Sequence, residues 1–139
     1  MNERRVRKAT AVLLRPRSDG SDDVLVITHP ADGGGVMLQL PAGTVEDGES
    51  PDDAAVRELL EETGVAAELR ALVGVLDEVH EGESRRRWIY VLDAPDDVRG
   101  EWDATCDCGA AIRCSWAPFD TVELHEAQQP WIDLARASL

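Results

Sequence analysis

The stretch GTVEDGESPDDAAVRELLEETGV, residues 43–65, organises the rest of the chain. Ser50 can cap a first helical turn, Pro51 suits the first helical position, and Gly64 suits a left-handed stop. The stretch therefore predicts a helix that begins at Pro51 and ends before Gly64.

This helix has two contrasting faces when its residues are placed about 100° apart around the axis. The arc expected to face the core holds Ala55, Val56, Leu59, Leu60 and Thr63. The other arc is almost wholly acidic and holds Ala54, Arg57, Glu58, Glu61 and Glu62. Glu58 with Glu62 is a like-charge pair that costs roughly 0.2–0.5 kcal/mol, and the last turn is the negative end of the helix dipole. Such a face invites a compensating cation, although a charged helix face is also typical of simple exposure to water.

A fixed constellation distinguishes this face from an ordinary solvated one. An arginine lies between carboxylates, with a glycine loop before the helix and a glycine stop after it. The positions are Gly43, Glu49, Arg57-Glu58-Leu59, Glu61-Glu62 and Gly64-Val65. This string resembles the Nudix box, the signature of the Nudix hydrolases, at all nine specified positions.

The resemblance implies an α/β (α+β) fold, a Nudix-like α/β/α sandwich with a mixed β-sheet between helices. A single domain over residues 1–139 is expected, because this length suits one core and no internal repeat or linker interrupts it. Apolar runs predict strands at 7–14, 24–27, 36–40, 67–78, 88–92 and 112–116, with 67–78 either one strand or two broken at Gly74. We also expect a turn at 41–43, a loop over 93–111, and helical pieces at 122–128 and from Pro130, the second with Trp131, Leu134 and Leu139 toward the core.

The resemblance assigns metal ligation to Glu58, Glu61 and Glu62, together with the backbone carbonyl of Ala42. Oxygen ligands of this kind suit Mg²⁺ or Mn²⁺, which keep several waters and bridge to substrate phosphates. Arg57 and Glu49 are expected to hold the loop and the helix in register through an ion pair. The implied reaction is hydrolysis of a diphosphate bond in a nucleoside diphosphate linked to another group.

The general base that activates the water is left open by the sequence. Glu58 is the first candidate and Glu101 in the long loop is the second. Further acids in loops are Glu81, Glu83, Asp103 and Asp107. A single loop acid is more often merely solvated.

The substrate class is also open. Residues 40–43, LPAG, resemble the entry to the box in ADP-ribose and other nucleoside-diphosphate-sugar pyrophosphatases. A proline that often follows the box in the ADP-ribose group is missing where Val79 and His80 lie. Nucleoside triphosphates and dinucleoside polyphosphates therefore remain alternatives, as do a nucleotide-sensing module without turnover and a plain interaction surface.

The charge balance of 28 acids against 14 bases, a formal net charge of -14, argues against nucleic-acid or anionic-membrane partners. In so acidic a chain, Arg85, Arg86 and Arg87 are candidate substrate-phosphate contacts or, equally, solvent-facing residues at a strand start. Trp102 or Trp88 could stack on a base or be buried in the core. The expected partner is a small molecule, and the expected state is a monomer or homodimer.

Three cysteines, Cys106, Cys108 and Cys114, do not make a disulfide framework and fit a reducing compartment. With no signal-type segment and no apolar run of about 18 residues, the sequence predicts a cytoplasmic protein. The cysteines, with His125, could also form a zinc site, although their spacing matches no standard pair of knuckles.

Overall fold

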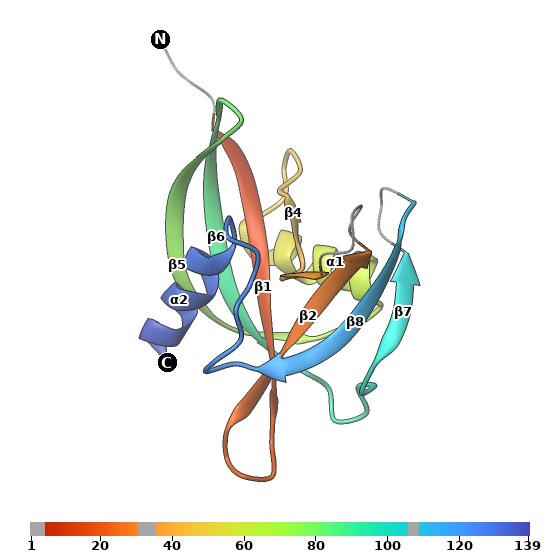
Figure 1. The fold of residues 1–139 in the computed structure, drawn as a ribbon. Helices are drawn as coiled ribbons and strands as arrows, with labels where there is room; N and C mark the ends of the chain where they lie inside the picture. Colours follow the sequence, from red (N-terminus) through yellow and green to blue (C-terminus); the bar gives the residue numbers. More distant parts are fainter. Residues whose placement is uncertain (1–4, 31–35, 106–108) are drawn as a thin grey trace.

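The computed structural model describes residues 5–30, 36–105 and 109–139. Its elements (Figure 1), in chain order, are β1 (Val6–Pro16), β2 (Asp22–Pro30), β3 (Val36–Gln39), β4 (Ala42–Thr44), α1 (Pro51–Thr63), β5 (Glu68–His80), β6 (Glu83–Asp93), β7 (Trp102–Thr105), β8 (Ala111–Pro118) and α2 (Gln129–Ser138).

Within the described residues the strands form one mixed sheet in the order β5-β6-β1-β2-β8-β7. β1 and β6 pair in parallel, and the other pairs are antiparallel. The two halves of β1 have different neighbours on the side away from β6, because Ala9 pairs with Gly43 of β4 whereas Leu14 pairs with Val24 of β2. This change of partner brings the loop before α1 against the first half of β1.

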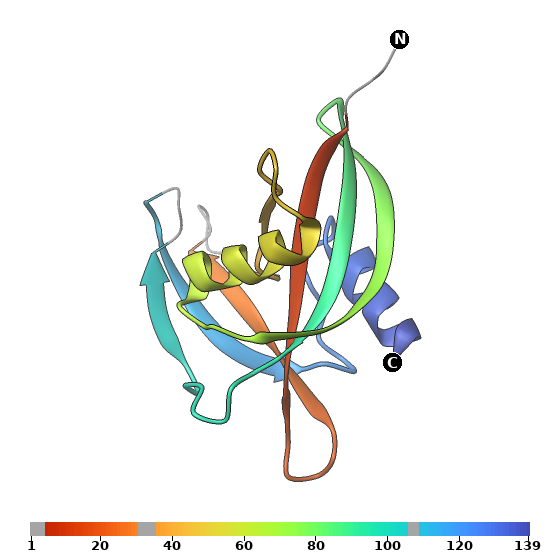
Figure 2. The same ribbon diagram turned by 180° about the vertical axis from the view of Figure 1, so that it is seen from behind.

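The helices cover opposite faces of the sheet (Figures 1 and 2). Because side chains alternate along a strand, β1 sends Ala9 and Leu13 into the core beneath α1 and Val12 and Leu14 into the core beneath α2. The predicted α/β/α sandwich with a mixed sheet is confirmed. Neither described helix has the length and apolar character needed to cross a membrane.

The predicted cap at Ser50 and the predicted helix stop at Gly64 are confirmed for α1. The Ser50 side chain accepts a hydrogen bond from the Asp53 amide at 3.1 Å, and Gly64 adopts a left-handed conformation at φ 78°. The predicted faces were partly wrong, because Leu60 is 48% exposed while Ala54 and Glu58 are buried. The helix packs with its acidic flank turned against β4, so the buried face includes residues that the apolar pattern assigned to solvent.

The strand at 67–78 is one continuous strand, β5, and does not break at Gly74. Its pairing with β6 instead shifts register between Leu69 and Ala71 and between Leu72 and Gly74. Gly74 allows α2 to pack closely on β5, because a Cβ atom at this position would lie 2.1 Å from a methyl carbon of Leu134 in α2.

Four expectations were wrong. Ala42 and Gly43 of the expected turn lie in strand β4, and the expected loop over 93–111 contains strand β7. These short strands depend on pairing, β4 with β1 and β7 with β8, rather than on a local pattern. Residues 122–128 are not helical, because the His125 amide donates to Leu38 of β3 at 2.9 Å. The final helix does turn Trp131 and Leu134 inward, but Leu139 is 57% exposed at its end.

Candidate active site

Arg57 is the centre of a carboxylate cluster on α1. Its Nε and Nη2 atoms donate to the two carboxylate oxygens of Glu49 at 2.7 and 2.9 Å. Its Nη1 atom donates to Glu58 at 2.9 Å and to Glu61 at 3.1 Å. The bidentate bonds to Glu49, strengthened by Glu58, raise the pKa of Arg57 above its ordinary value. Arg57 therefore joins three acids from the loop and the helix.

The same arginine fixes the loop that precedes α1. Its Nη2 atom also donates to the backbone carbonyl of Thr44 at 3.0 Å, and Glu49 accepts from the Glu46 amide at 3.0 Å. The hydrogen bonds from Arg57 and Glu46 lower the pKa of Glu49 to about 2. The ion pair expected between Arg57 and Glu49 is thus present and connects the loop to the helix.

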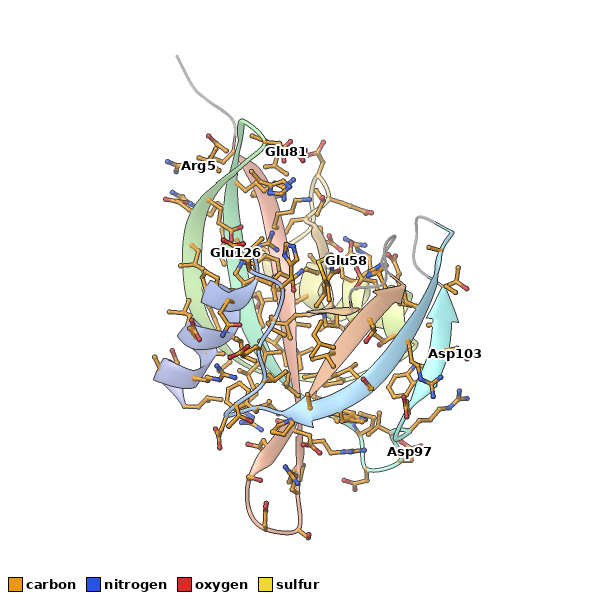
Figure 3. All side chains as sticks on the ribbon, in the orientation of Figure 1. Arg5, Glu58, Glu81, Asp97, Asp103 and Glu126 are labelled. Carbon is orange, nitrogen blue, oxygen red and sulfur yellow. The ribbon has the colours of Figure 1, made fainter. Side chains whose placement is uncertain are left out.

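Glu58 lies between α1 and β4 (Figure 3) and is only 7% exposed. A Cβ atom at position 43 would lie 2.0 Å from its carboxyl carbon and 2.3 Å from both carboxylate oxygens. Gly43 is therefore required for this close approach, since any side chain there would displace the acid. The carboxylate lies directly against the main chain of β4, which includes Ala42.

The donors fit a hard divalent cation. Glu58, Glu61 and Glu62 lie on one flank of α1, and the Glu58 carboxylate lies against the main chain of β4 at Gly43. All are oxygen ligands, the type that Mg²⁺ and Mn²⁺ prefer. In the described ranges no three acid, histidine or cysteine side chains are gathered as a metal cage, and the Glu58 and Glu61 carboxylates are bonded to Arg57.

A cavity of about 380 Å³ lies on the α2 side of the sheet, where β5 and β6 meet the segment before α2. Seven of its lining residues are polar or charged: Gln39, Glu78, His80, Arg85, Arg87, His125 and Gln128. Burial lowers the pKa of Lys8, and the charges of Arg85 and Arg87 lower it further, while Glu83 and Glu58 act in the opposite direction. Lys8 thus lies within electrostatic reach of both the cavity arginines and the α1 acids.

Arg87 lines this cavity and is held in place by several partners. It is 3% exposed, donates to Glu78 at 2.8 Å and to Thr10 at 2.9 Å, and lies 3.7 Å from the centre of the Trp131 ring. The Trp131 indole donates to the second oxygen of Glu78 at 2.6 Å. Burial lowers the pKa of Arg87, and Glu78 partly offsets this effect. The network ties β1, β5, β6 and α2 together.

The alternation of β6 separates the three predicted arginines. Arg85 and Arg87 line the cavity, and Arg85 donates to Glu83 at 2.8 Å. Arg86 points to the other face of the sheet and pairs with Asp77 at 2.8 Å. The structure therefore brings two of the three cations to one place.

Trp102 lies elsewhere, at the C-terminal end of α1. It is 8% exposed, and its indole donates to the Thr63 carbonyl at 2.8 Å. It lines a second cavity of about 550 Å³ that also borders Glu61 and Glu62. Trp88 is packed against the core on the α1 side.

The loop acids that the structure describes are not part of the Arg57 cluster. Glu101 and Asp103 both pair with Arg113 at 2.6 Å, and Glu83 pairs with Arg85. Glu81 lies in the hairpin between β5 and β6, and in Figure 3 it and Asp103 are well separated from Glu58. Asp107 lies outside the described residues.

The proposed zinc site is also only partly described, because Cys106 and Cys108 lie outside the described residues. Cys114 is a buried free thiol whose pKa is raised to about 11 by burial and by the charges of Glu62 and Asp103. His125 accepts from the Ala127 amide at 3.2 Å.

Sequence reasoning favoured a solvated terminus over a phosphate contact for the N-terminal basic residues, which include Lys8, and it missed the Glu78–Trp131 link behind Arg87. These residues are scattered along the chain and belong to no local motif, so pairing of β1, β5 and β6 is what assembles them. The glycine at position 43 was the one local signal that a side chain or ligand comes close to β4.

The sequence model of the NUDIX domain family matches residues 5–135 of this chain. An RNA pyrophosphohydrolase of Novosphingobium aromaticivorans is 45% identical over 67 residues, which are 48% of this chain and 35% of that protein. Diphosphoinositol polyphosphate phosphohydrolase 3-alpha of Mus musculus is 31% identical over 105 residues, 73% of this chain and 60% of that protein. The chain thus spans between 35% and 60% of the length of these two curated relatives.

Solved structures share the fold at low sequence identity. A NUDIX hydrolase from Nitrosomonas europaea matches with a TM-score of 0.69 at 23% identity, covering 96% of this chain and 90% of that one. The NUDIX domain of Shewanella oneidensis NrtR, complexed with ADP ribose, matches with a TM-score of 0.72 at 16% identity, covering 98% of this chain and 89% of that one. These likenesses extend over nearly the whole chain and concern its fold.

Proposed function

Because the chain belongs to the NUDIX domain family, we propose that it is a divalent-metal-dependent pyrophosphohydrolase that cleaves a diphosphate bond in a nucleoside diphosphate linked to another group. One observation carries this proposal: Arg57 holds Glu49, Glu58 and Glu61 together while the Glu58 carboxylate fills the space that Gly43 leaves beside β4. A solvated acidic face would not need a carboxylate buried against the main chain of β4. This placement therefore supports a role for the helix in presenting oxygen ligands to a metal ion.

Glu58, Glu61 and Glu62, with the carbonyl of Ala42, would hold Mg²⁺ or Mn²⁺. When bound, such ions neutralise phosphate charge and make a water more acidic. Glu58 is the proposed acceptor, at its carboxylate, of the proton that the attacking water loses. Arg57 is a positioning residue, since its bonds to Glu49 and Glu58 keep the loop and the helix in register.

The cationic cavity is the proposed place for the substrate. Lys8 and Arg85 would pair with phosphate oxygens that extend from the α1 acids toward the cavity. His80, His125 and Gln128 offer polar contacts to the remainder of the substrate. Arg87 is already bonded on several sides and would contribute mainly its charge. In a chain of net charge -14, this local positive charge offers the help that an anionic substrate needs.

ADP-ribose and nucleotide sugars are the first substrate candidates, on the LPAG entry to the box. The cluster of Lys8, Arg85 and Arg87 favours a second class with more phosphates: nucleoside triphosphates, dinucleoside polyphosphates, or the RNA and diphosphoinositol polyphosphates named for the two relatives. A sensing module that binds without turnover would use the same cavity.

A substrate panel tests the activity. ADP-ribose, nucleotide sugars, nucleoside triphosphates, dinucleoside polyphosphates, 5′-triphosphorylated RNA and a diphosphoinositol polyphosphate would be incubated with the full chain and Mg²⁺, and phosphate release measured after coupling to a phosphatase. Turnover of at least one compound that stops on chelation is expected. Binding without turnover throughout would make the chain a sensor, and absence of both would exclude the proposal.

The position of attack and the metal ligands need separate measurements. Hydrolysis in ¹⁸O-labelled water should place the label on a phosphate product, whereas label only on the other fragment would show attack at carbon. Calorimetric titration with Mn²⁺ should show strongly weakened binding in Glu61→Gln and Glu62→Gln. Glu68→Gln, an exposed acid on β5, is the matched control and should bind Mn²⁺ like the wild type.

A further inference from the structure

Gln128, which lines the cationic cavity, is held in one orientation by the main chain. Its side-chain oxygen accepts a hydrogen bond from the Leu40 amide at 2.7 Å. Because a backbone N–H only donates, the atom that faces Leu40 must be the oxygen, and the two N–H groups of Gln128 are left to bond elsewhere. Gln128 therefore offers the cavity hydrogen-bond donors.

His125, which also lines this cavity, is oriented in the same sense. Its Nδ1 atom accepts a hydrogen bond from the Ala127 amide at 3.2 Å, so the neutral ring carries its proton on Nε2. Its main chain is fixed to β3, because the His125 amide donates to the Leu38 carbonyl at 2.9 Å. Within the described residues, His29 Nδ1 is the only fully buried side-chain nitrogen or oxygen without a partner, so the Nε2 atoms of His125 and Gln128 are open to a ligand.

The acceptor groups of the cavity are already engaged. One oxygen of the Glu78 carboxylate accepts from Arg87 at 2.8 Å and the other accepts from the Trp131 indole at 2.6 Å. Arg85 and Arg87 can only donate. The fixed groups of the cavity therefore favour a ligand group that accepts hydrogen bonds on several sides and donates none.

Charge separates the two chemical groups that fit this description, a phosphate and a nucleobase carbonyl. Arg85 and Arg87 line the same cavity, and α2 begins beside it with the positive end of its dipole, since Gln128 is the N-cap residue. A nucleobase would gain most from stacking on an aromatic ring. Trp131 is only 5% exposed, however, and the Arg87 guanidinium lies 3.7 Å from the centre of its ring. The anionic group therefore fits better.

We propose that Gln128 and His125 are specificity-determining residues that bind a phosphate group of the substrate other than the diphosphate that is cleaved. This inference rests on the proposed function, because it takes the cavity as the place for the substrate. A sugar hydroxyl also accepts hydrogen bonds, but it brings no charge and its own proton needs an acceptor. The site therefore selects compounds with a further phosphate over ADP-ribose and unphosphorylated nucleotide sugars.

Calorimetric titration of the full chain with inorganic tripolyphosphate, in the presence of a chelator, tests the donor groups without any turnover. Gln128→Glu keeps an oxygen for the Leu40 amide but replaces the donor by an anionic acceptor. The dissociation constant should rise by at least about tenfold, because a bond to a charged group is replaced by repulsion. Thermal unfolding checks that each variant is folded.

Gln129→Glu is the matched control. Its oxygen keeps the bond from the Leu124 amide, and it adds the same charge at the next residue, which does not line the cavity. The dissociation constant should change by less than about threefold at physiological salt, because exposed charges are largely screened.

His125→Asn and His125→Asp form a second test of the same idea. An oxygen of either side chain can accept from the Ala127 amide, while the remaining group donates in asparagine and accepts in aspartate. His125→Asp should therefore bind tripolyphosphate at least about fivefold more weakly than His125→Asn. Guanosine and uridine, which offer carbonyl groups without charge, should bind the wild type at least about tenfold more weakly than tripolyphosphate.

Paired substrates test the selection itself. NADPH and coenzyme A contain the same diphosphate as NADH and dephospho-coenzyme A, respectively, and carry one phosphate more. With Mg²⁺, kcat/KM should be higher for the phosphorylated member of at least one pair by about tenfold, and Gln128→Glu should bring the two values together.

The outcomes separate this inference from the hydrolase proposal. Tripolyphosphate binding that weakens as expected in Gln128→Glu, with no turnover of any compound, would remove the hydrolase and leave the phosphate site. Turnover with equal kcat/KM within both pairs would overturn the phosphate site and leave the hydrolase. The phosphate site would also be overturned by a wild type that does not bind tripolyphosphate, by equal affinity in folded Gln128→Glu, or by guanosine or uridine binding as tightly as tripolyphosphate.

Discussion

Arg57 and Arg87 are both bonded to carboxylates, yet they occupy opposite kinds of surroundings. The Arg57 side chain is 23% exposed and bridges acids of a loop and a helix, with acid groups in excess of its single charge. The Arg87 side chain is 4% exposed and meets one acid, one hydroxyl and one indole. The first cluster has negative charge left for a cation, whereas the second is closed and stabilises the sheet against α2.

This difference predicts which measurement responds to each region. Changes in the Arg57 cluster should act mainly on turnover and metal binding, because Arg57 holds Glu58 and Glu61, which are proposed metal ligands. Changes at Arg87 should act mainly on the free energy of unfolding, because the arginine and its partners Thr10 and Trp131 are buried and the half-buried Glu78 would lose its counter-charge.

The largest effect is expected for Glu58→Gln. Positioned general-base catalysis typically contributes about 10²–10⁴-fold, so kcat should fall by about that factor while the fold survives. Because Glu58 is also a proposed metal ligand, kcat should be measured at saturating Mg²⁺, with occupancy checked by Mn²⁺ titration. Full kcat under these conditions would remove Glu58 from the role of base and direct attention to the loop acids.

Arg87→Met should lower the free energy of unfolding by about 2 kcal/mol, because it leaves the half-buried Glu78 carboxylate without its cation and the buried Thr10 hydroxyl without its donor. Urea unfolding followed by circular dichroism measures this change. Arg85→Met is the control: Arg85 is only half-buried, so its loss should change stability by less than about 1 kcal/mol and should instead raise KM. Equal losses of stability in the two variants would contradict the distinction between Arg87 as a structural residue and Arg85 as a substrate contact.

Arg57→Ala should lower turnover and stability together, the latter by about 1–2 kcal/mol, since Glu49 and Glu58 lose hydrogen bonds to a charged partner at a partly exposed site. Arg57→Lys keeps the charge but loses the fork that binds Glu49, so it should recover only part of both properties. A stable variant that lost only substrate affinity would make Arg57 a phosphate-binding residue.

The smallest effect is the pH dependence that Glu49 adds to stability. Its pKa lies at about 2 in the folded chain, below the ordinary 4.5, so the folded state favours the ionised carboxylate. The stabilisation is fully present above pH 4.5 and is lost as the pH falls toward 2. Unfolding measured between these values should show a shallower decline in Glu49→Gln. An unchanged pH profile would mean that the bond to Arg57 does not differ between the folded and unfolded chain.

Much of α1 was predictable because its determinants are local. The cap at Ser50, the proline at position 51 and the left-handed Gly64 act within one turn of the residues they limit, and the structure has them as predicted. Strand β7 was not predictable, because four residues carry no periodicity and become a strand only by pairing with β8. The exposure of Leu60 was missed for a related reason: helical spacing defines an apolar face but not the neighbour that the helix turns toward.

The amino-acid sequence by itself determined the family resemblance, the central helix and the set of acids on it. All of these lie within one continuous stretch of 23 residues, in which the spacing along the helix decides which side chains share a face. Only the tertiary structure decided that Glu58 is buried against Gly43, that Arg85 and Arg87 share a cavity with Lys8 nearby, and that the segment before α2 turns hydrogen-bond donors toward this cavity. These features join residues far apart in the chain, and strand pairing and the side on which each helix packs decide which of them meet.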